Sequence, residues 1–395
     1  MQADEALAPE SATGELTKTA VITSSALDDL LTSLAKDGFS VIGPTRRGDT
    51  IVLGEIGGTR DLPDGWIDHH APGKYRLEHS ETNRVFDCTI GAHAWKKYLF
   101  PARRRLWSAS RNGSPASVEF QSEESDTPPY AFVGVRACDL AAIAIQDRVF
   151  MGGSHPDPVY SKRRNTAVII AVNCTRAVDS CFCASMGTGP RATGGFDLAL
   201  TEIPHKARTA FVVETGSPRG AELLSRIASR PADKKSLARA RSLRQQAVDD
   251  QHRTLDPDAT RQLLLESLNH PEWKTVDERC LSCGNCTMVC PTCFCSTVED
   301  TTDLTGTAAE RWQVWDSCFN PDHSYIHGGY VRKTTGSRYR QWITHKLATW
   351  KDQFGTSGCV GCGRCITWCP VAIDITEEVR AIDPNGRKVG PGRRK

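Results

Sequence analysis

The sequence predicts an α/β body in the N-terminal part of the chain, followed by a smaller and mostly helical unit built around cysteines. Apolar runs alternate with amphipathic segments up to about residue 270, as strands alternate with helices in an α/β layer. Beyond that point, cysteines crowd into two tight runs at 280–295 and 359–369. A segment with helical periodicity at 339–350 lies between the runs, so we expect helices to support them.

The composition is that of an ordinary globular protein, with 395 residues, 39% apolar and 24% charged residues and a net charge of +2. No window approaches the roughly 20 consecutive apolar residues of a membrane helix, so no membrane span is expected. The first residues lack the apolar core of a secretory signal, which favours a cytoplasmic location where thiols stay reduced. The 16 cysteines are therefore better explained as metal ligands than as disulfides.

The first part of the body is predicted from short periodic segments. Residues 1–20 are rich in Ala, Glu, Thr and Ser without periodicity, which indicates a flexible tail before an α/β domain at 21–270. An amphipathic pattern predicts a helix at 26–36. Apolar runs bounded by Gly and Arg predict strands at 39–44 and 50–56.

The second part of the body begins after a segment at 108–129 that is rich in Ser, Pro and Glu and predicts a loop. From there, apolar runs and amphipathic segments alternate more clearly. They predict strands at 130–135, 167–172, 197–203 and 210–214, and helices at 140–150, 219–229, 235–252 and 259–270. Pro271 marks the predicted boundary with the C-terminal unit, at 271–380.

Two C-terminal segments repeat one cysteine pattern, C-x-x-C-x-x-C-x-x-x-C-P. The segments are Cys280–Cys283–Cys286–Cys290–Pro291 and Cys359–Cys362–Cys365–Cys369–Pro370. Three thiolates at this spacing surround one side of a 4Fe-4S cubane, and the fourth, before proline, ligates the other cluster in two-cluster ferredoxins. The spacing therefore predicts a two-cluster, ferredoxin-like unit. One cluster would be held by Cys280, Cys283, Cys286 and Cys369, and the other by Cys359, Cys362, Cys365 and Cys290. A zinc site would instead favour paired C-x-x-C units.

A less regular group of cysteines lies in the body. Cys138 and Cys174 each follow a predicted strand, and Cys181 and Cys183 come shortly after. If the two strands are parallel neighbours, both cysteines emerge at carboxyl ends, where α/β proteins place their sites. The four thiolates could then hold one metal centre. The spacing alone leaves an iron–sulfur cluster, a zinc ion and unliganded core cysteines open.

Several segments outside the generic ferredoxin pattern carry a family resemblance. They are GVRACDL, YSKRRNT, NCTRAVDSCFCASMGTGP, GFDLALTEI, CGNCTMVCPTCFC, WDSC and GCVGCGRCITWCPVAIDI. In them, the chain resembles the iron–sulfur beta subunit of cytosolic NADP-linked nickel–iron hydrogenases of the sulfhydrogenase type. It is equally similar to the iron–sulfur electron-transfer subunit of anaerobic sulfite reductase. The resemblance covers about residues 20 to 380.

The resemblance implies an electron-transfer subunit. In the hydrogenases, such a subunit relays electrons between a flavin subunit that handles NADPH and the small and large subunits with the catalytic metals. The resemblance also implies that Cys138, Cys174, Cys181 and Cys183 ligate a third 4Fe-4S cluster. The alternative partner is the sirohaem subunit of a sulfite reductase.

The absence of other motifs favours this non-catalytic role. No Walker loop, Rossmann glycine fingerprint or acid–base grouping stands out in the sequence. Basic residues gather at 230–253 and in the tail 381–395, but aromatic residues are not interleaved with them, so no nucleic acid is expected as a partner. Two other interpretations stay open: a zinc-bound structural module, and a standalone enzyme that reduces sulfur with a spare thiol. Four cysteines have no predicted role: Cys88, Cys293, Cys295 and Cys318.

Overall fold

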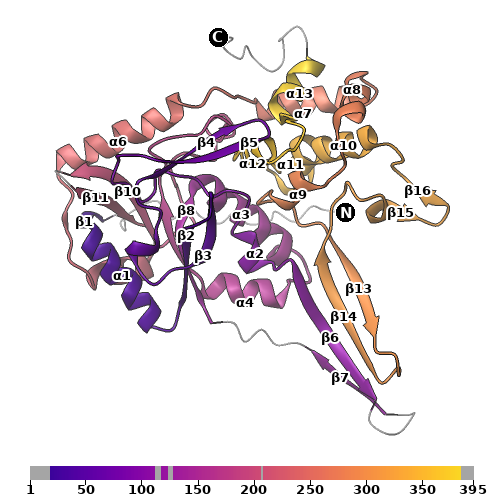
Figure 1. Ribbon diagram of the computed structural model, residues 1–395, viewed down its shortest axis with the longest axis horizontal. Coiled ribbons are helices and arrows are strands. Elements are labelled where there is room, and N and C mark those ends of the chain that lie inside the picture. The colour runs from indigo at the N-terminus through magenta and orange to yellow at the C-terminus, as the bar shows by residue number, and fades with distance from the viewer. Residues whose placement is uncertain (1–17, 112–116, 123–127, 206–207, 384–395) are drawn as a thin grey trace, which may run out of the picture.

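An eight-stranded sheet forms the centre of the N-terminal body in the computed structural model, which describes residues 18–111, 117–122, 128–205 and 208–383 (Figure 1). Its strands follow the order β12-β1-β11-β10-β9-β8-β2-β3. Their bounds are β1 (Thr19–Thr23), β2 (Ser40–Arg47), β3 (Thr50–Glu55), β8 (Tyr130–Arg136), β9 (Val168–Val172), β10 (Leu198–His205), β11 (Arg208–Thr215) and β12 (Arg230–Pro231). The four strands from β2 to β10 at the centre pair in parallel, and the outer pairs are antiparallel.

The apolar character of the central strands explains their position, because a parallel sheet is covered on both faces. On β8, Val133 faces the core shared with α1, whereas Phe132 faces the core shared with α2, α3 and α4. Helix α5 covers the same face as α1, and α6 packs on the sheet beside β10 and β11. The helices of the body are α1 (Ser24–Lys36), α2 (Lys96–Leu99), α3 (Ala137–Met151), α4 (Pro158–Thr166), α5 (Pro218–Ser225), α6 (Lys234–Asp249) and α7 (Pro257–Glu266).

The structure confirms the mixed α/β body, and its elements match most of the predicted strands and helices of this part to within a few residues at their ends. The exception is the loop predicted at 108–129. Strand β6 (Arg103–Arg111) enters this segment and β7 (Val118–Ser122) lies within it, while residues 112–116 and 123–127 are outside the described part. Strand β7 is exposed and β6 is mostly half-buried, and both are rich in polar residues, so neither carries a clear apolar periodicity. The prediction of a loop there was wrong.

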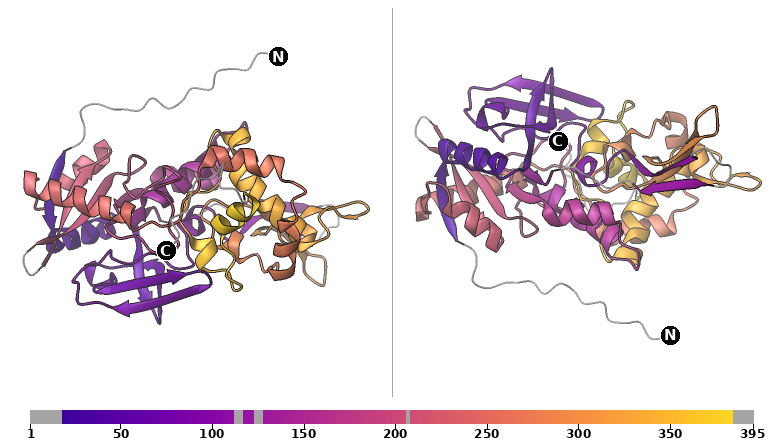
Figure 2. Two further views of the ribbon diagram at one scale, coloured as in Figure 1. Left: turned by 90° about the horizontal axis from the view of Figure 1, so that it is seen from above. Right: turned by 90° about the horizontal axis from the view of Figure 1, so that it is seen from below.

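A second hairpin, β4 (Trp66–Ala71) with β5 (Lys74–His79), was also not predicted. Its dark purple strands lie to one side of the molecule, next to the yellow C-terminal helices (Figure 2). The contact between the two is direct, because the backbone N–H of Gly73, in the turn of the hairpin, donates to the carbonyl of Ile366 at 3.0 Å. The hairpin thus ties the body to the second cysteine run.

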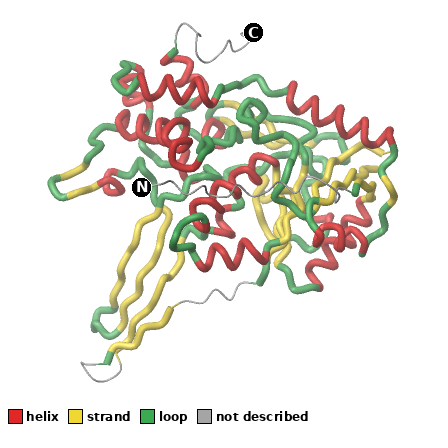
Figure 3. Tube along the Cα trace, turned by 180° about the vertical axis from the view of Figure 1, so that it is seen from behind, coloured by secondary structure: helices red, strands yellow, loops and turns green. Residues whose placement is uncertain are grey.

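The C-terminal unit contains strands as well as helices (Figure 3), and the prediction that it is mostly helical is not confirmed. Its helices are α8 (Glu272–Arg279), α9 (Asn285–Met288), α10 (Thr335–Thr344), α11 (Trp350–Phe354), α12 (Arg364–Thr367) and α13 (Ile375–Ile382). Its strands are β13 (Ser296–Thr302), β14 (Ala308–Trp315), β15 (Tyr325–Ile326) and β16 (Gly329–Tyr330). Strands β13 and β14 join β6 and β7 in a four-stranded sheet that projects from the molecule (Figure 1).

This shared sheet crosses the boundary predicted at Pro271, since β14 of the C-terminal unit pairs with β6 of the body. The domain limits remain a prediction. The flexible tail predicted at 1–20 and the basic tail predicted at 381–395 fall mainly on residues 1–17 and 384–395, which lie outside the described residues. Within the described part, the chain has no helix whose length and apolarity would suit a membrane span.

Candidate metal centres

The first cysteine run forms a site together with the last cysteine of the second run. Cys280 ends α8, and Gly284, in the left-handed conformation with φ of 74°, starts the short helix α9 that carries Cys286. One cavity is lined by Cys280, Cys283, Cys286 and Cys369. The N–H of Ile373 donates to the Sγ of Cys369 at 3.3 Å. The fold therefore brings together the four thiols that the spacing assigns to one cluster, although their ligand role stays a prediction.

The second run forms a neighbouring site with Cys290. The thiols of this site influence one another's pKa, and they are Cys290, Cys359, Cys362 and Cys365. A buried cation lies against them: the Nζ of Lys346 donates to the Sγ of Cys290 at 3.3 Å and to the Oγ1 of Thr292 at 2.9 Å. Lys346 belongs to a π-helical turn, His345–Thr349, between α10 and α11. Such turns are often found at functional sites.

The middle cysteines form a third site at the carboxyl ends of β8 and β9, which are parallel neighbours, so the condition set for their meeting is fulfilled. Cys138 lies in the first turn of α3, and Cys174 follows β9. A single cavity is lined by Cys138, Cys174, Cys181 and Cys183. Two polar side chains contact these sulfurs: Arg136 donates to Cys174 at 3.7 Å, and Gln251 donates to Cys183 at 3.5 Å. Their role as ligands also stays a prediction.

The second and third sites lie against each other. The Phe182 N–H donates to the Gly361 carbonyl at 2.8 Å. Gly361 and Gly363 have φ of 64° and 71°, and a Cβ on either would lie 2.6 Å or less from the backbone of the third-site loop. Only glycine fits both the conformation and the space. A buried ion pair adds to this contact, because Arg364 in α12 donates to Asp139 in α3 at 2.8 Å and 3.1 Å.

Burial is the largest influence on the pKa of the third-site thiols Cys138, Cys181 and Cys183. It raises the pKa of Cys181 to about 12 and lifts the pKa of Cys138 well above the ordinary value. Such thiols remain protonated at neutral pH unless positive charge compensates them, and binding of a metal centre releases their protons. Buried cationic side chains lie beside two of the sites. They are Arg136 and Arg364 at the third site and Lys346 at the second. Sulfur donors, nearby N–H groups and buried cations together fit anionic iron–sulfur clusters.

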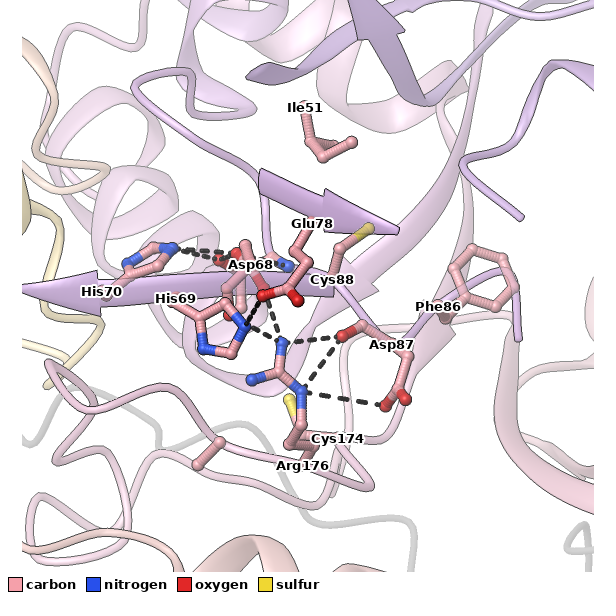
Figure 4. Close-up of polar contacts among 12 residues, drawn as sticks. Ile51, Asp68, His69, His70, Glu78, Phe86, Asp87, Cys88, Cys174 and Arg176 are labelled. Carbon is pink, nitrogen blue, oxygen red and sulfur yellow. Dashed lines mark hydrogen bonds and ion pairs between the residues drawn. The ribbon is translucent and has the colours of Figure 1, made fainter. Parts of the chain in front are cut away.

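A buried carboxylate network, which the sequence did not reveal, holds the loop that carries Cys174 (Figure 4). Arg176 donates to the Oδ1 of Asp68 at 2.7 Å and to the carbonyl of Asp87 at 2.8 Å. Although burial opposes it, hydrogen bonding to His70 and the charges of His70 and Arg176 lower the pKa of Asp68. The Nε2 of His70 lies 2.8 Å from Asp68 Oδ2. Asp68 and His70 occupy the buried positions of β4, but its sequence, WIDHHA, has no apolar–polar alternation that would have marked them.

A cleft of about 930 Å³ opens beside the third site. Its walls come from α3, α6 and the loop 187–195, and the arginines Arg164, Arg191, Arg241 and Arg244 line it. Gly189 separates the cleft from the third site: a Cβ there would lie 3.0 Å from the Cys183 sulfur. At the first site, Cys283 is exposed, next to the 63% exposed Leu281.

The remaining cysteines are not alike. Cys88 is buried and isolated, and burial raises the pKa of its thiol. Cys293 hydrogen-bonds to Cys290, whereas Cys295 and Cys318 hydrogen-bond to each other. In the segments that the structure describes, no three His, Cys, Asp or Glu side chains converge closely enough to hold a single metal ion.

Comparison with known proteins agrees with this arrangement. Residues 279–373 match the family model of a 4Fe-4S dicluster domain. The chain is similar to sulfhydrogenase 2 subunit beta of Pyrococcus furiosus, with 33% identity over 322 residues that cover 80% of this chain and 91% of the relative. No solved structure matches the chain. The chain therefore belongs to the family of sulfhydrogenase beta subunits and has an iron–sulfur electron-transfer role, with a 4Fe-4S dicluster domain at its C-terminal end.

Proposed function

We propose that this chain is the iron–sulfur relay subunit of a cytoplasmic nickel–iron hydrogenase complex and that it holds three 4Fe-4S clusters. One observation carries the proposal: the three cysteine sites adjoin one another in a row. Cys365 of the second run also lines the cavity of the first site, and Cys362 also lines the cavity of the third. A row of adjoining sites supports stepwise transfer of electrons through the chain.

The ligand sets proposed are the crossed sets of the two runs for the first and second clusters, and the four middle cysteines for the third. When bound, such clusters exchange single electrons without making or breaking bonds in a substrate. The residues around them hold the sulfurs, exclude water and donate hydrogen bonds to the thiolates. At the third site, the four cysteines line one cavity together with Arg136 and Arg364, whose positive charges suit an anionic cluster.

The surfaces next to the first and third sites, at the two ends of the row of sites, support binding of partner subunits. The arginine-lined cleft lies directly over Cys183, and the exposed Cys283 and Leu281 lie at the first site. A partner at either face would come close to a cluster. We assign these partners to a flavin subunit that binds NADP and to the hydrogenase small and large subunits, because the relative is named as a sulfhydrogenase beta subunit. Which partner takes which face is left open. The cytoplasmic location is supported by the free thiols.

Isolation of the native complex tests the proposal. The full chain, with an affinity tag, would be purified anaerobically from its own organism, and its partners identified by mass spectrometry and metal analysis. We expect the chain to copurify with a flavin subunit, together with a large subunit that contains nickel. Copurification of a sirohaem subunit without nickel would refute the hydrogenase assignment and establish the sulfite reductase alternative. Reduction of polysulfide by the purified chain alone, with an artificial donor, would refute the non-catalytic role.

A further inference from the structure

Two cysteines that the clusters do not use lie together at the base of the projecting sheet. Cys295 directly precedes β13, and Cys318 follows the last residue of β14 by three residues. Their side chains hydrogen-bond to each other, and the N–H of Cys318 also donates to the Cys295 sulfur. Both residues are half-buried, so that solvent reaches the pair.

The backbone fixes this proximity. Strands β13 and β14 form a continuous antiparallel ladder that ends with Ser296 opposite Trp315. One step further, the N–H of Asp316 donates to the carbonyl of Cys295 at 2.9 Å. The two thiols are therefore neighbours because of the ladder, and they do not need a bound metal to meet.

The surroundings make the two thiols unequal. The hydrogen bond from Cys318 lowers the pKa of Cys295 to about 6, against the effect of burial, and the charges of His323 and Lys346 lower it further. His323 is oriented by Asp316, whose Oδ2 lies 2.7 Å from its Nδ1. The same hydrogen bond and burial raise the pKa of Cys318. Cys295 is thus the thiolate of the pair, and Cys318 is the thiol that keeps a proton.

Other cysteines outside the proposed ligand sets lack this combination. Cys88 is buried and has no neighbouring thiol with which it hydrogen-bonds in the described structure. Cys293 hydrogen-bonds to Cys290, but Cys290 belongs to the proposed ligand set of the second cluster. Only Cys295 and Cys318, among the described cysteines, form a hydrogen-bonded pair of which neither member is assigned to a cluster.

We propose that Cys295 and Cys318 form a redox-active dithiol that reduces low-molecular-weight disulfides. The thiolate of Cys295 attacks one sulfur of the disulfide, forms a mixed disulfide and releases one thiolate. Cys318 then loses its proton and attacks the Cys295 sulfur, which releases the second thiol and leaves a Cys295–Cys318 disulfide. The pair gives up two electrons, and the small disulfide becomes two thiols. In reduced compartments, protein disulfides of this kind are transient and functional. The proposal does not depend on the electron-transfer role.

The test uses oxidised glutathione and the full-length chain with its iron in place, under anaerobic conditions. After incubation, free thiols are alkylated in denaturant, the chain is digested, and peptides are identified by mass spectrometry. We expect a crosslinked Cys295–Cys318 peptide, release of about two glutathione molecules per chain, and loss of the crosslink after excess dithiothreitol. The variant C318S is expected to stop at the mixed disulfide, with glutathione held on Cys295 and about half the release.

The matched controls separate this reaction from other roles. C295S is expected to lose both the crosslink and the mixed disulfide, whereas C88S should behave as the unaltered chain does. Iron content is measured for every variant and should not change. Separate alkylation of Cys295 and Cys318 after the glutathione treatment would overturn the proposal. A loss of about four iron atoms in C295S would also overturn it, because Cys295 would then be a cluster ligand.

Discussion

The buried cation Lys346 allows the sharpest prediction about the second cluster. Its Nζ lies 3.3 Å from the Cys290 sulfur, and the residue is buried, with only 4% of its surface exposed. Burial lowers the pKa of Lys346, but the neighbouring Cys290 and Cys293 raise it well above its usual range, so the ammonium stays charged. A fixed positive charge beside the cluster favours the reduced form, which carries one more electron. Replacing Lys346 by methionine, of similar length, should therefore lower the reduction potential.

The magnitude follows from Coulomb's law. An added electron spreads over the cluster, so we take a distance of roughly 6 Å, about twice that from the ammonium to the sulfur. With an effective dielectric constant of about 20, the interaction is roughly 2.8 kcal/mol. For a one-electron couple, this corresponds to a fall in potential of about 120 mV.

The assay is a redox titration monitored by EPR on the full chain, with iron content measured in parallel. K346M should shift one of the signals by about −120 mV, whereas K346R, which keeps the charge, should shift it by much less. Lys351, one turn further along and paired with Asp258 on the surface, provides the matched control, and K351M should leave all signals within about 20 mV. An unchanged or raised potential in K346M with full iron content would refute the reasoning.

The remaining predictions concern the ligand sets and the contact between the second and third sites. C138S should lower the iron content by about four atoms per chain, while C88S should leave it unchanged. Equal iron content in both variants would refute the prediction of a third cluster. C290S should abolish the EPR signal of the cluster held by the second run, and loss of the first-run signal instead would contradict the crossed ligand sets. D139N should lower the free energy of unfolding by about 3–5 kcal/mol in denaturant titrations, because it leaves the buried Arg364 charge without its partner; a loss below about 1 kcal/mol would show that water compensates that charge.

Much of the body could be predicted from the sequence because its strands carry strong local signals. The run 167–172 is apolar throughout, as a strand covered on both faces must be, and it forms β9, all of whose residues are buried. The meeting of Cys138 and Cys174 at one edge follows from topology if these two strands are parallel neighbours, which the structure shows β8 and β9 to be. The spacing of the C-terminal cysteines similarly predicted that Cys369 would meet the first run.

The features that were missed depend on contacts between distant segments. Strand β6 is rich in polar residues and mostly half-buried, and it pairs with β14 about 200 residues later, as in Trp107 opposite Arg311. A local pattern cannot specify such a partner. The network around Asp68 was missed for the same reason, because Arg176 contacts Asp68 from a loop 108 residues later in the chain. The pair Cys295–Cys318 was likewise hidden, because its proximity depends on a hairpin between the two cysteines that was not predicted.

The iron content and EPR spectra of the anaerobically purified full chain test the central claim most directly. Three clusters require about 12 iron atoms and as many acid-labile sulfides per chain, and reduction should give three separately titrating EPR signals. A content of about 8 iron atoms would contradict the third cluster, and stoichiometric zinc without iron would contradict the relay altogether.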